Sequence, residues 1–173
     1  MERIFEVTGR SQQFIVNELI KSIGYFVVVY FIATVLKPGI EYLAASYLFI
    51  GFIILELFPS IILHLQYYAW NSDTIVGIEN VSKRFDVYYK DEEIIFYFHQ
   101  IKKITLYLDA GKYRGYRRGA ASWDLYHYAV IELEDGKKIV VTCLLINDLV
   151  KFFKDLGLET EKEKIIFPLI LKN

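Results

Sequence analysis

Two long apolar runs dominate the first 70 residues, and polar residues occur mainly at their ends. The second run, "LFIGFIILELFPSIILHL" from Leu48 to Leu65, has Leu, Ile or Phe at 13 of its 18 positions. Extended back to Ile40 it would form a helix of roughly 39 Å, longer than the bilayer's hydrocarbon core of about 30 Å. A buried strand would be far shorter. The pattern predicts a transmembrane helix over about residues 43–66.

The first apolar run, Ile23 to Leu36, is too short by itself to cross a bilayer. It becomes long enough if the helix begins near Ser11, because serine is a common N-cap residue. We therefore predict a first span over about residues 14–36. Pro38 and Gly39 follow it, and this pair ends helices and turns the chain.

Residues 1–70 are thus predicted to be an N-terminal segment followed by a two-helix transmembrane hairpin. Both ends of a hairpin lie on the same side of the membrane. Basic residues are common beside these ends, whereas the turn between the helices carries only Lys37, offset by Glu41. Basic flanks favour the cytoplasmic side. We expect a multi-pass protein of the cytoplasmic membrane with both termini in the cytoplasm; the alternative is a pair of soluble core helices.

Polar residues inside the second span form a candidate intramembrane docking site. A charge such as Glu56 costs about 2.5–3.5 kcal/mol at a helix centre, whereas the apolar residues return roughly 4–8 kcal/mol, so insertion is still favoured. Glu56 needs a partner, and its expected depth lies near Tyr25 and Tyr30 of the first helix. Pro59 frees a backbone carbonyl and predicts a kink. Glu56 could be bonded within the hairpin or an oligomer, dock another membrane protein, or serve an ion path with His64.

Beyond residue 70 the periodicity changes from helical to alternating. Apolar residues recur at every second position over residues 85–108, which predicts strands. Asp135-Gly136 between two β-rich runs is a strong hairpin signal. A final amphipathic helix is expected between a cap at Asn147 and a stop at Gly157. The fold class is therefore α+β: a helical hairpin followed by a bent antiparallel sheet closed by a helix.

This order of elements resembles the bacterial PH-like (pleckstrin-homology-like) domains that follow two transmembrane helices in small membrane proteins. The resemblance is carried by the helix pair, "FHQIKKITLYL", "YAVIELEDGKKIVVTCLLI" and the closing helix with Phe167-Pro168 after it. It implies a PH-like antiparallel β-barrel over residues 71–173, capped by a C-terminal amphipathic helix. It also implies an inner-membrane location and a scaffolding or regulatory role rather than catalysis.

A basic loop precedes the second half of the β-rich part. No acidic residue occurs from Ala110 to Trp123, and basic side chains near an anionic leaflet contribute about 1 kcal/mol each. Aromatic residues in the loop could insert among lipid headgroups. A partner protein or a solvated connector are the other interpretations. The candidate residues for headgroup or partner binding are Lys112, Tyr113, Arg114, Tyr116, Arg117, Arg118 and Trp123.

No pattern of catalytic or metal-ligating residues is found. The three histidines are scattered, and the single cysteine, Cys143, lies in an apolar run typical of a buried position. The acidic groups at Asp91–Glu93 and Glu159–Glu163 are interpreted as solvated turns and helix ends. The net charge of −1 gives no strong attraction to nucleic acid. We therefore expect no enzyme, no cofactor, no metal and no nucleic-acid partner.

The predicted function is that of a membrane-anchored accessory or scaffolding subunit. Its cytosolic PH-like domain would engage a partner protein or anionic lipid headgroups. The expected partners are membrane lipid and either another membrane protein or a second copy of the chain. The alternative is a small subunit of an ion- or proton-coupled transport complex that uses Glu56.

Overall fold

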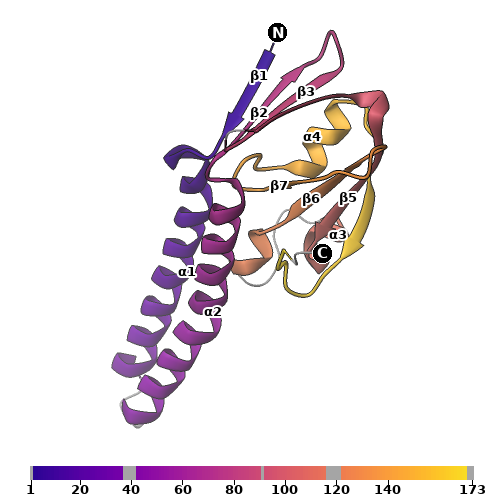
Figure 1. The fold of residues 1–173 in the computed structure, drawn as a ribbon. Coiled ribbons are helices and arrows are strands. Elements are labelled where there is room, and N and C mark those ends of the chain that lie inside the picture. The colour runs from indigo at the N-terminus through magenta and orange to yellow at the C-terminus, as the bar shows by residue number, and fades with distance from the viewer. Residues whose placement is uncertain (1, 37–41, 91, 116–121, 171–173) are drawn as a thin grey trace.

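Two long antiparallel helices project from one side of a β-domain (Figure 1). The computed structural model describes residues 2–36, 42–90, 92–115 and 122–170. Helix α1 spans Gly9–Leu36 and helix α2 spans Tyr42–Asn71. Both contain segments long and apolar enough to cross a membrane, namely Ile15–Val35 with 21 residues and Phe49–Asn71 with 23. As helices these measure about 31 and 35 Å.

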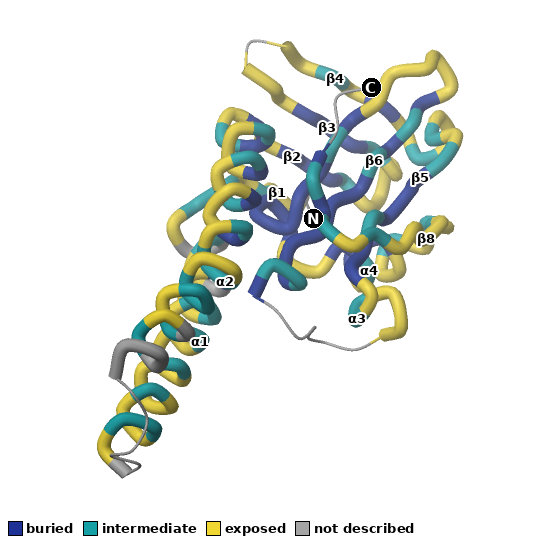
Figure 2. The backbone as a smooth tube through the Cα atoms, turned by 90° about the horizontal axis from the view of Figure 1, so that it is seen from below, coloured by how far each residue is buried: buried dark blue, intermediate teal, exposed yellow. Residues whose placement is uncertain are grey.

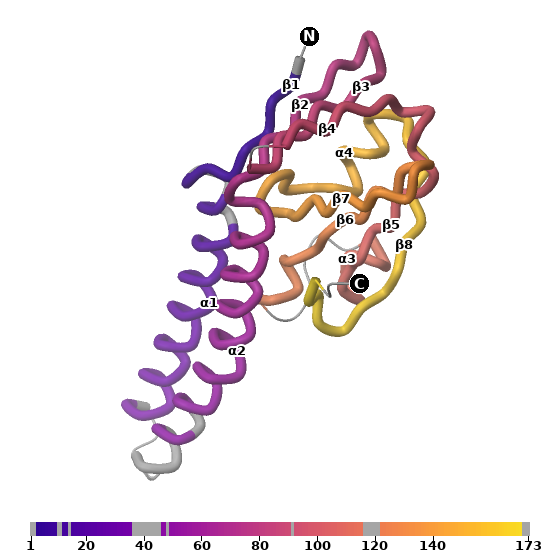
Figure 3. Tube along the Cα trace, in the orientation of Figure 1, coloured from indigo at the N-terminus to yellow at the C-terminus, as the bar shows by residue number. Residues whose placement is uncertain are grey.

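The helix pair is inserted between the first two strands of a sheet. Strand β1 (Glu2–Glu6) pairs antiparallel with β2 (Thr74–Glu79), the first strand after α2. Figure 3 shows β1 beside β2, with both helices leaving the same end of this strand pair. The predicted division placed every strand after residue 70. The five-residue β1 escaped prediction because its partner comes only after both helices, so no local hairpin pattern marks it.

Two four-stranded sheets make up the β-domain. Sheet A has the order β1-β2-β3-β4, and sheet B has the order β7-β6-β5-β8. All neighbours are antiparallel except β5 and β8, which are parallel. The remaining strands are β3 (Arg84–Tyr89), β4 (Glu92–Tyr97), β5 (Ile101–Leu108), β6 (Tyr128–Leu133), β7 (Lys138–Thr142) and β8 (Glu161–Lys164).

Short helices connect and close the sheets. These are the 3-10 turns η1 (Phe98–Gln100) and η2 (Ser122–Leu125) and the α-helices α3 (Ala110–Tyr113) and α4 (Leu149–Asp155). The predicted closing helix is confirmed as α4, although its N-cap is Asp148 rather than Asn147. The Asp148 side chain accepts the Lys151 N–H at 3.0 Å, which satisfies an otherwise unpaired donor of the first turn.

The hydrophobic core lies between the sheets and under α4. The predicted alternation is confirmed at Phe96, Ile104, Leu106 and Leu108, which all point inward and are buried. The Asp135-Gly136 turn joins β6 to β7, and Gly136 has the positive φ of 85° that this turn requires. These contacts make sheets A and B one packed unit.

Strand β8 lies where the sequence predicted a solvated helix end or turn, at Glu159–Glu163. Its four side chains, Glu161 to Lys164, are all exposed, yet its backbone pairs in parallel with β5. A strand without an apolar face produces no alternating hydrophobic pattern, which explains why the sequence did not reveal it. Similarly, Glu92 and Glu93 belong to β4 rather than to the preceding turn. The exposed charged side chains of β8 are of the kind that protects a sheet edge from unwanted pairing.

Candidate functional site at the helix–domain junction

One face of α2 packs against the β-domain along the C-terminal half of the helix. Ser60, Leu63, Tyr67 and Asn71 recur at three- and four-residue spacing, and each is at most 1% exposed. Figure 2 shows the contrast between this buried stretch of α2 and the mostly exposed far ends of both helices. The hairpin is therefore joined to the β-domain by packing as well as by its chain connections.

Two polar side chains fasten the end of α2 to sheet B and the C-terminal segment. The Asn71 amide bridges the edge of β7, because its Oδ1 accepts the Thr142 N–H at 2.9 Å and its Nδ2 donates to the Val140 carbonyl at 3.2 Å. The buried Tyr67 hydroxyl donates to the Pro168 carbonyl at 2.8 Å. Buried donors and acceptors are costly when unpaired, so these bonds specify one seating of the domain on the helix.

Glu56 belongs to the same junction. Its Oε1 accepts the backbone N–H of Ser122 at 2.6 Å. The Ser60 hydroxyl donates to the Glu56 carbonyl at 3.0 Å and lies 2.7 Å from the Ser122 hydroxyl oxygen. The carboxylate therefore joins α2 to η2 of its own chain. A charge-assisted bond from a backbone N–H is the kind of partner that a carboxylate in an apolar setting requires.

The tyrosine partner predicted for Glu56 is wrong. The hydroxyl oxygen of Tyr30 instead lies 3.2 Å from that of Ser46. Tyr25 contacts Phe26 edge-to-face and is largely exposed. Phe26 stacks on Phe52 of α2. Glu56 is one turn nearer the β-domain than residue 52, so it lies level with the turn of α1 that precedes Phe26, out of reach of Tyr30.

His64 and Pro59 lie within the same stretch of α2. One imidazole nitrogen of His64 lies 3.1 Å from Gln12 Oε1 of α1, and the other lies 3.2 Å from the Tyr126 hydroxyl of the β-domain. His64 thus connects both helices and the domain. Pro59 lies inside α2, and the next residue, Ser60, donates its hydroxyl one turn back to the Glu56 carbonyl.

The basic loop is not a single outward-facing surface. The Lys112 ammonium turns inward, donating to the Leu125 carbonyl at 2.8 Å and lying 2.6 Å from His127 Nδ1. Burial lowers the pKa of Lys112. Burial, together with the neighbouring Lys112, lowers the pKa of His127 to about 3, so the imidazole is neutral. Lys112 therefore ties α3 to the end of η2, with its ammonium directed into the fold rather than toward solvent.

The other loop residues divide into three sets. Tyr113 and Arg114 are exposed, whereas Trp123 is partly buried against the cluster that contains Tyr67 and Tyr126. Tyr116, Arg117 and Arg118 lie outside the described residues. The sequence could not separate these roles because a lysine side chain is long enough to point either to solvent or back into the fold.

Replacing Lys112 with Met is expected to lower the free energy of unfolding by about 2–3 kcal/mol. The change removes the lysine donor from the buried His127 imidazole and leaves the Leu125 carbonyl with only the His127 Nδ1 contact at 2.9 Å, and unmade buried hydrogen bonds cost this much. The comparison variant is Arg114→Met, an exposed position where a change within about 0.5 kcal/mol is expected. Denaturant unfolding of the full chain in mild detergent measures both. Equal effects of the two substitutions would show that Lys112 is not buried.

The residues that bond to α2 from the rest of the fold were not predicted from the sequence. Ser122, Tyr126 and Gln12 carry no local motif, and each meets α2 only through the tertiary fold. One signal was present in α2 itself. Ser60, His64 and Asn71 are polar residues in a mostly apolar helix, at spacings that place them near one face. A polar stripe of this kind indicates contact with protein rather than with lipid.

The fold and the junction define an α+β domain of two packed sheets with a closing helix and an inserted helical hairpin. The chain matches the PH domain family over residues 5–152. Because this match covers most of the chain, the protein belongs to the PH domain family. The matched region includes both long helices and ends within α4, so β8 and the C-terminal segment lie beyond it. No curated protein and no solved structure gives a significant match to the chain.

Proposed function

We propose that the protein is a membrane-anchored scaffold or accessory subunit. In this proposal α1 and α2 cross the cytoplasmic membrane, and the PH domain is held at the cytoplasmic surface in one orientation to engage lipid headgroups and a partner protein. The observation that carries the proposal is the insertion of the hairpin between β1 and β2, combined with the packing of α2 on sheet B.

The exposed surface of the hairpin supports membrane insertion. Outward-facing side chains of both helices are large and apolar over most of their length, and soluble monomers rarely expose apolar patches of this extent. The part of α2 before Ser60, where its burial by the β-domain begins, has 18 residues and measures about 27 Å as a helix, close to a hydrocarbon core of about 30 Å. Exposed members of this surface are Val27, Val28, Phe31, Ile32 and Val35 of α1 and Ile50, Ile54, Leu55, Phe58 and Ile61 of α2.

The attachment of the hairpin supports a fixed platform. A domain on a flexible linker could adopt many orientations, whereas here β1 leads into α1 and α2 leads into β2, and these two strands pair with each other. The bonds of Glu56, His64 and Asn71 add three further attachments to η2, Tyr126 and β7. Because Glu56 and His64 bond within the chain, they support anchoring of the PH domain rather than an ion path.

One side of the β-domain is placed to face the membrane surface. Helix α3 and the segment after β8 lie on the side toward which the helices run, whereas the β2–β3 turn lies at the opposite end (Figure 1). Ile166, in the segment after β8, is 90% exposed. Tyr113 and Arg114, at the end of α3, are also exposed. Exposed apolar, aromatic and basic side chains on the same side of a domain are typical of a lipid headgroup contact.

A dye placed at Ile166 is expected to contact lipid, whereas a dye at Val81 is not. Val81 lies in the β2–β3 turn and is 86% exposed, so it is a matched control for Ile166. The variants Ile166→Cys and Val81→Cys can be labelled selectively because the native Cys143 is buried and its pKa is raised to about 11. The full chain is reconstituted in liposomes that contain lipids spin-labelled near the headgroup, and fluorescence quenching is measured.

Strong quenching at position 166 with little at position 81 is the expected result. Comparison of anionic with zwitterionic liposomes then tests whether headgroup charge strengthens this contact. Equal quenching at both positions, or stronger quenching at position 81, would contradict the proposed orientation of the PH domain.

A further inference from the structure

The edges of the two sheets differ in how they are protected against pairing with another strand. Strand β7 is covered by α2 through Asn71, and β8 presents only exposed charged side chains. Strand β4, the last strand of sheet A, carries Ile94, Ile95 and Phe96 in its middle, and Ile95 is 51% exposed. An edge strand with an apolar centre is open to strand addition unless something covers it.

The backbone of β4 has pairing groups directed away from the sheet. Phe98, which follows β4, donates its N–H to the Lys83 carbonyl at 2.8 Å. In an antiparallel ladder alternate residues bond to the same neighbour, so Ile94 and Phe96 bond toward β3. The N–H and C=O groups of Glu93 and Ile95 therefore point away from β3, toward the open edge.

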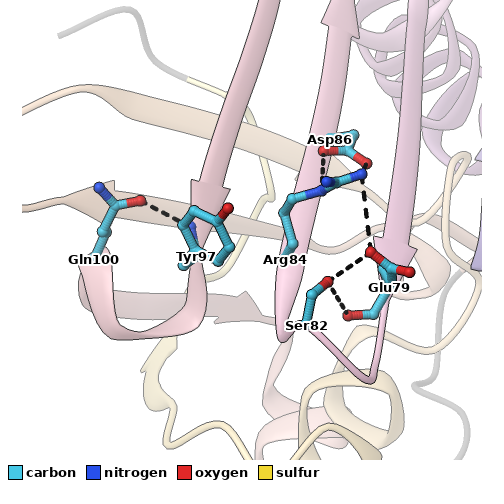
Figure 4. A network of polar contacts seen from close by, with 6 residues as sticks. All are labelled: Glu79, Ser82, Arg84, Asp86, Tyr97 and Gln100. Atoms are coloured by element: carbon cyan, nitrogen blue, oxygen red, sulfur yellow. Dashed lines mark hydrogen bonds and ion pairs between the residues drawn. The ribbon is translucent and has the colours of Figure 1, made fainter.

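Gln100 limits this open edge at one end. Its side-chain oxygen accepts the Tyr97 N–H at 2.8 Å, as Figure 4 shows, so the pairing groups of Tyr97 are partly occupied. The Gln100 carbonyl accepts the Glu134 N–H at 3.0 Å, which joins this corner to the β6–β7 turn. The open length of β4 is therefore the part from Glu92 to Ile95, enough for a strand of about four residues.

A cavity of about 190 Å³ lies beside this open length. Its apolar lining comes from Ile94, Ile95, Phe96 and Leu133, so strand β4 and the end of β6 form two of its sides. The cavity gives room for apolar side chains of an added strand. Backbone pairing and a neighbouring side-chain pocket are the two features that strand-addition sites combine.

The charges around this edge are mainly acidic. Glu134 and Asp135 line the cavity, and Glu93 is exposed on β4 itself. Lys137 also lines the cavity, but its ammonium lies 3.9 Å from the Asp135 carboxylate, so it offsets only one of these charges. The edge therefore has an acidic surplus, which favours a basic ligand.

We propose that the β4 edge binds an extended segment of a partner protein in which apolar residues alternate with Lys or Arg. The segment pairs with the backbone of Glu93 and Ile95 and places apolar side chains in the cavity. Its basic side chains lie beside Glu93, Glu134 and Asp135. This inference rests on the proposed scaffold function, because it names the surface by which the anchored domain holds its partner.

Binding of defined peptide probes to the full chain in neutral detergent tests this proposal. The probe is a fluorescent six-residue peptide of alternating Lys and Val, followed by anisotropy. Two matched peptides are compared with it: one carries Glu in place of Lys, and one is N-methylated at every residue so that neither of its edges can donate backbone hydrogen bonds. We expect the Lys peptide to bind at least tenfold more tightly than either, and its affinity to fall with added salt.

Two variants locate the site. Ile95→Pro removes an N–H that β3 does not use, a change tolerated at sheet edges, and is expected to weaken binding at least tenfold. The double variant Glu93→Lys/Glu134→Lys alters exposed side chains and is expected to reverse the preference, so that the Glu peptide binds more tightly than the Lys peptide. The control Glu161→Lys/Glu163→Lys makes the same charge change on β8 and should leave the preference unchanged.

Absence of binding by every peptide would overturn the proposal. So would equal binding of the N-methylated peptide, or an equal effect of the β8 control variant. None of these results would affect the fluorescence quenching of the dye at position 166, which tests membrane anchoring separately. A failure of the edge site and a failure of the scaffold function are therefore distinguishable.

Discussion

A double variant with Arg at both Val28 and Ile50 is expected not to insert its helix pair stably into membranes. Val28 is 56% exposed on α1 and Ile50 is 51% exposed on α2. Phe26 stacks on Phe52, and the hydroxyl oxygen of Tyr30 lies 3.2 Å from that of Ser46. Val28 and Ile50 lie between these two contacts on their helices, so they are at the same depth. Each Arg costs about 2.5–3.5 kcal/mol near the bilayer centre and also removes about 0.3–0.6 kcal/mol of favourable transfer, roughly 6–8 kcal/mol in total.

The fraction of protein that stays in membranes after extraction with alkaline carbonate measures this effect. The control variant Val28→Ile/Ile50→Val exchanges the two apolar residues and should remain in the membrane. A second control, Val81→Arg, adds a charge to the exposed β2–β3 turn and should have no effect. Membrane retention of the double Arg variant equal to that of the controls would contradict the placement of these helices in a bilayer.

Replacing Tyr67 with Ala is expected to lower the free energy of unfolding by about 3–5 kcal/mol, the range for deletion of a large buried ring. Tyr67 is fully buried between α2 and the β-domain. Its ring meets Tyr126 edge-to-face at a centroid distance of 5.3 Å and Tyr128 at 6.2 Å. The substitution also leaves the Pro168 carbonyl without its donor.

Two further variants separate the ring from the hydroxyl. Tyr67→Phe keeps the ring contacts and should cost only about 0.5–1.5 kcal/mol, the value of one hydrogen bond. Tyr68→Ala alters the adjacent, 45% exposed residue and should have a small effect. Denaturant unfolding in detergent gives the three values. A small effect of Tyr67→Ala, comparable to that of Tyr68→Ala, would show that α2 does not pack on the β-domain as described.

Features with a local periodic pattern could be predicted from the sequence. The two helices, the β6–β7 hairpin at Asp135-Gly136 and the closing helix α4 each occupy one continuous segment whose residues repeat at 3.6 or 2 positions. The inward alternation of Ile104, Leu106 and Leu108 belongs to the same class. In these elements burial requires apolar side chains at regular intervals, so the sequence records the structure directly.

Features that depend on distant partners could not be predicted. Strand β1 pairs across the whole hairpin, and β8 has no apolar face, so neither has a periodic signature. The direction of Lys112 depends on Leu125 and His127, which lie across the loop. Likewise, the sequence predicts Glu56 to be an intramembrane carboxylate, whereas in the fold it accepts the N–H of the distant residue Ser122.

The same long-range contacts explain why the functional interpretation shifts from the loop to the junction. Three positions of α2, Glu56, His64 and Asn71, bond to η2, Tyr126 and β7. They hold the PH domain against the helix that would anchor it. The proposed platform therefore has its orientation specified by the chain itself, and partner binding occurs on surfaces that the anchoring leaves exposed, such as the β4 edge.

Labelling with a membrane-impermeant maleimide on intact spheroplasts tests the central claim most directly. One variant carries Lys37→Cys, in the turn between the two apolar runs, and the other carries Val81→Cys, in the PH domain. If the hairpin crosses the cytoplasmic membrane twice, the cysteine at position 37 reacts in intact spheroplasts and the cysteine at position 81 reacts only after the membrane is opened. Protection of both cysteines until lysis, or reaction of both in intact spheroplasts, would contradict the account.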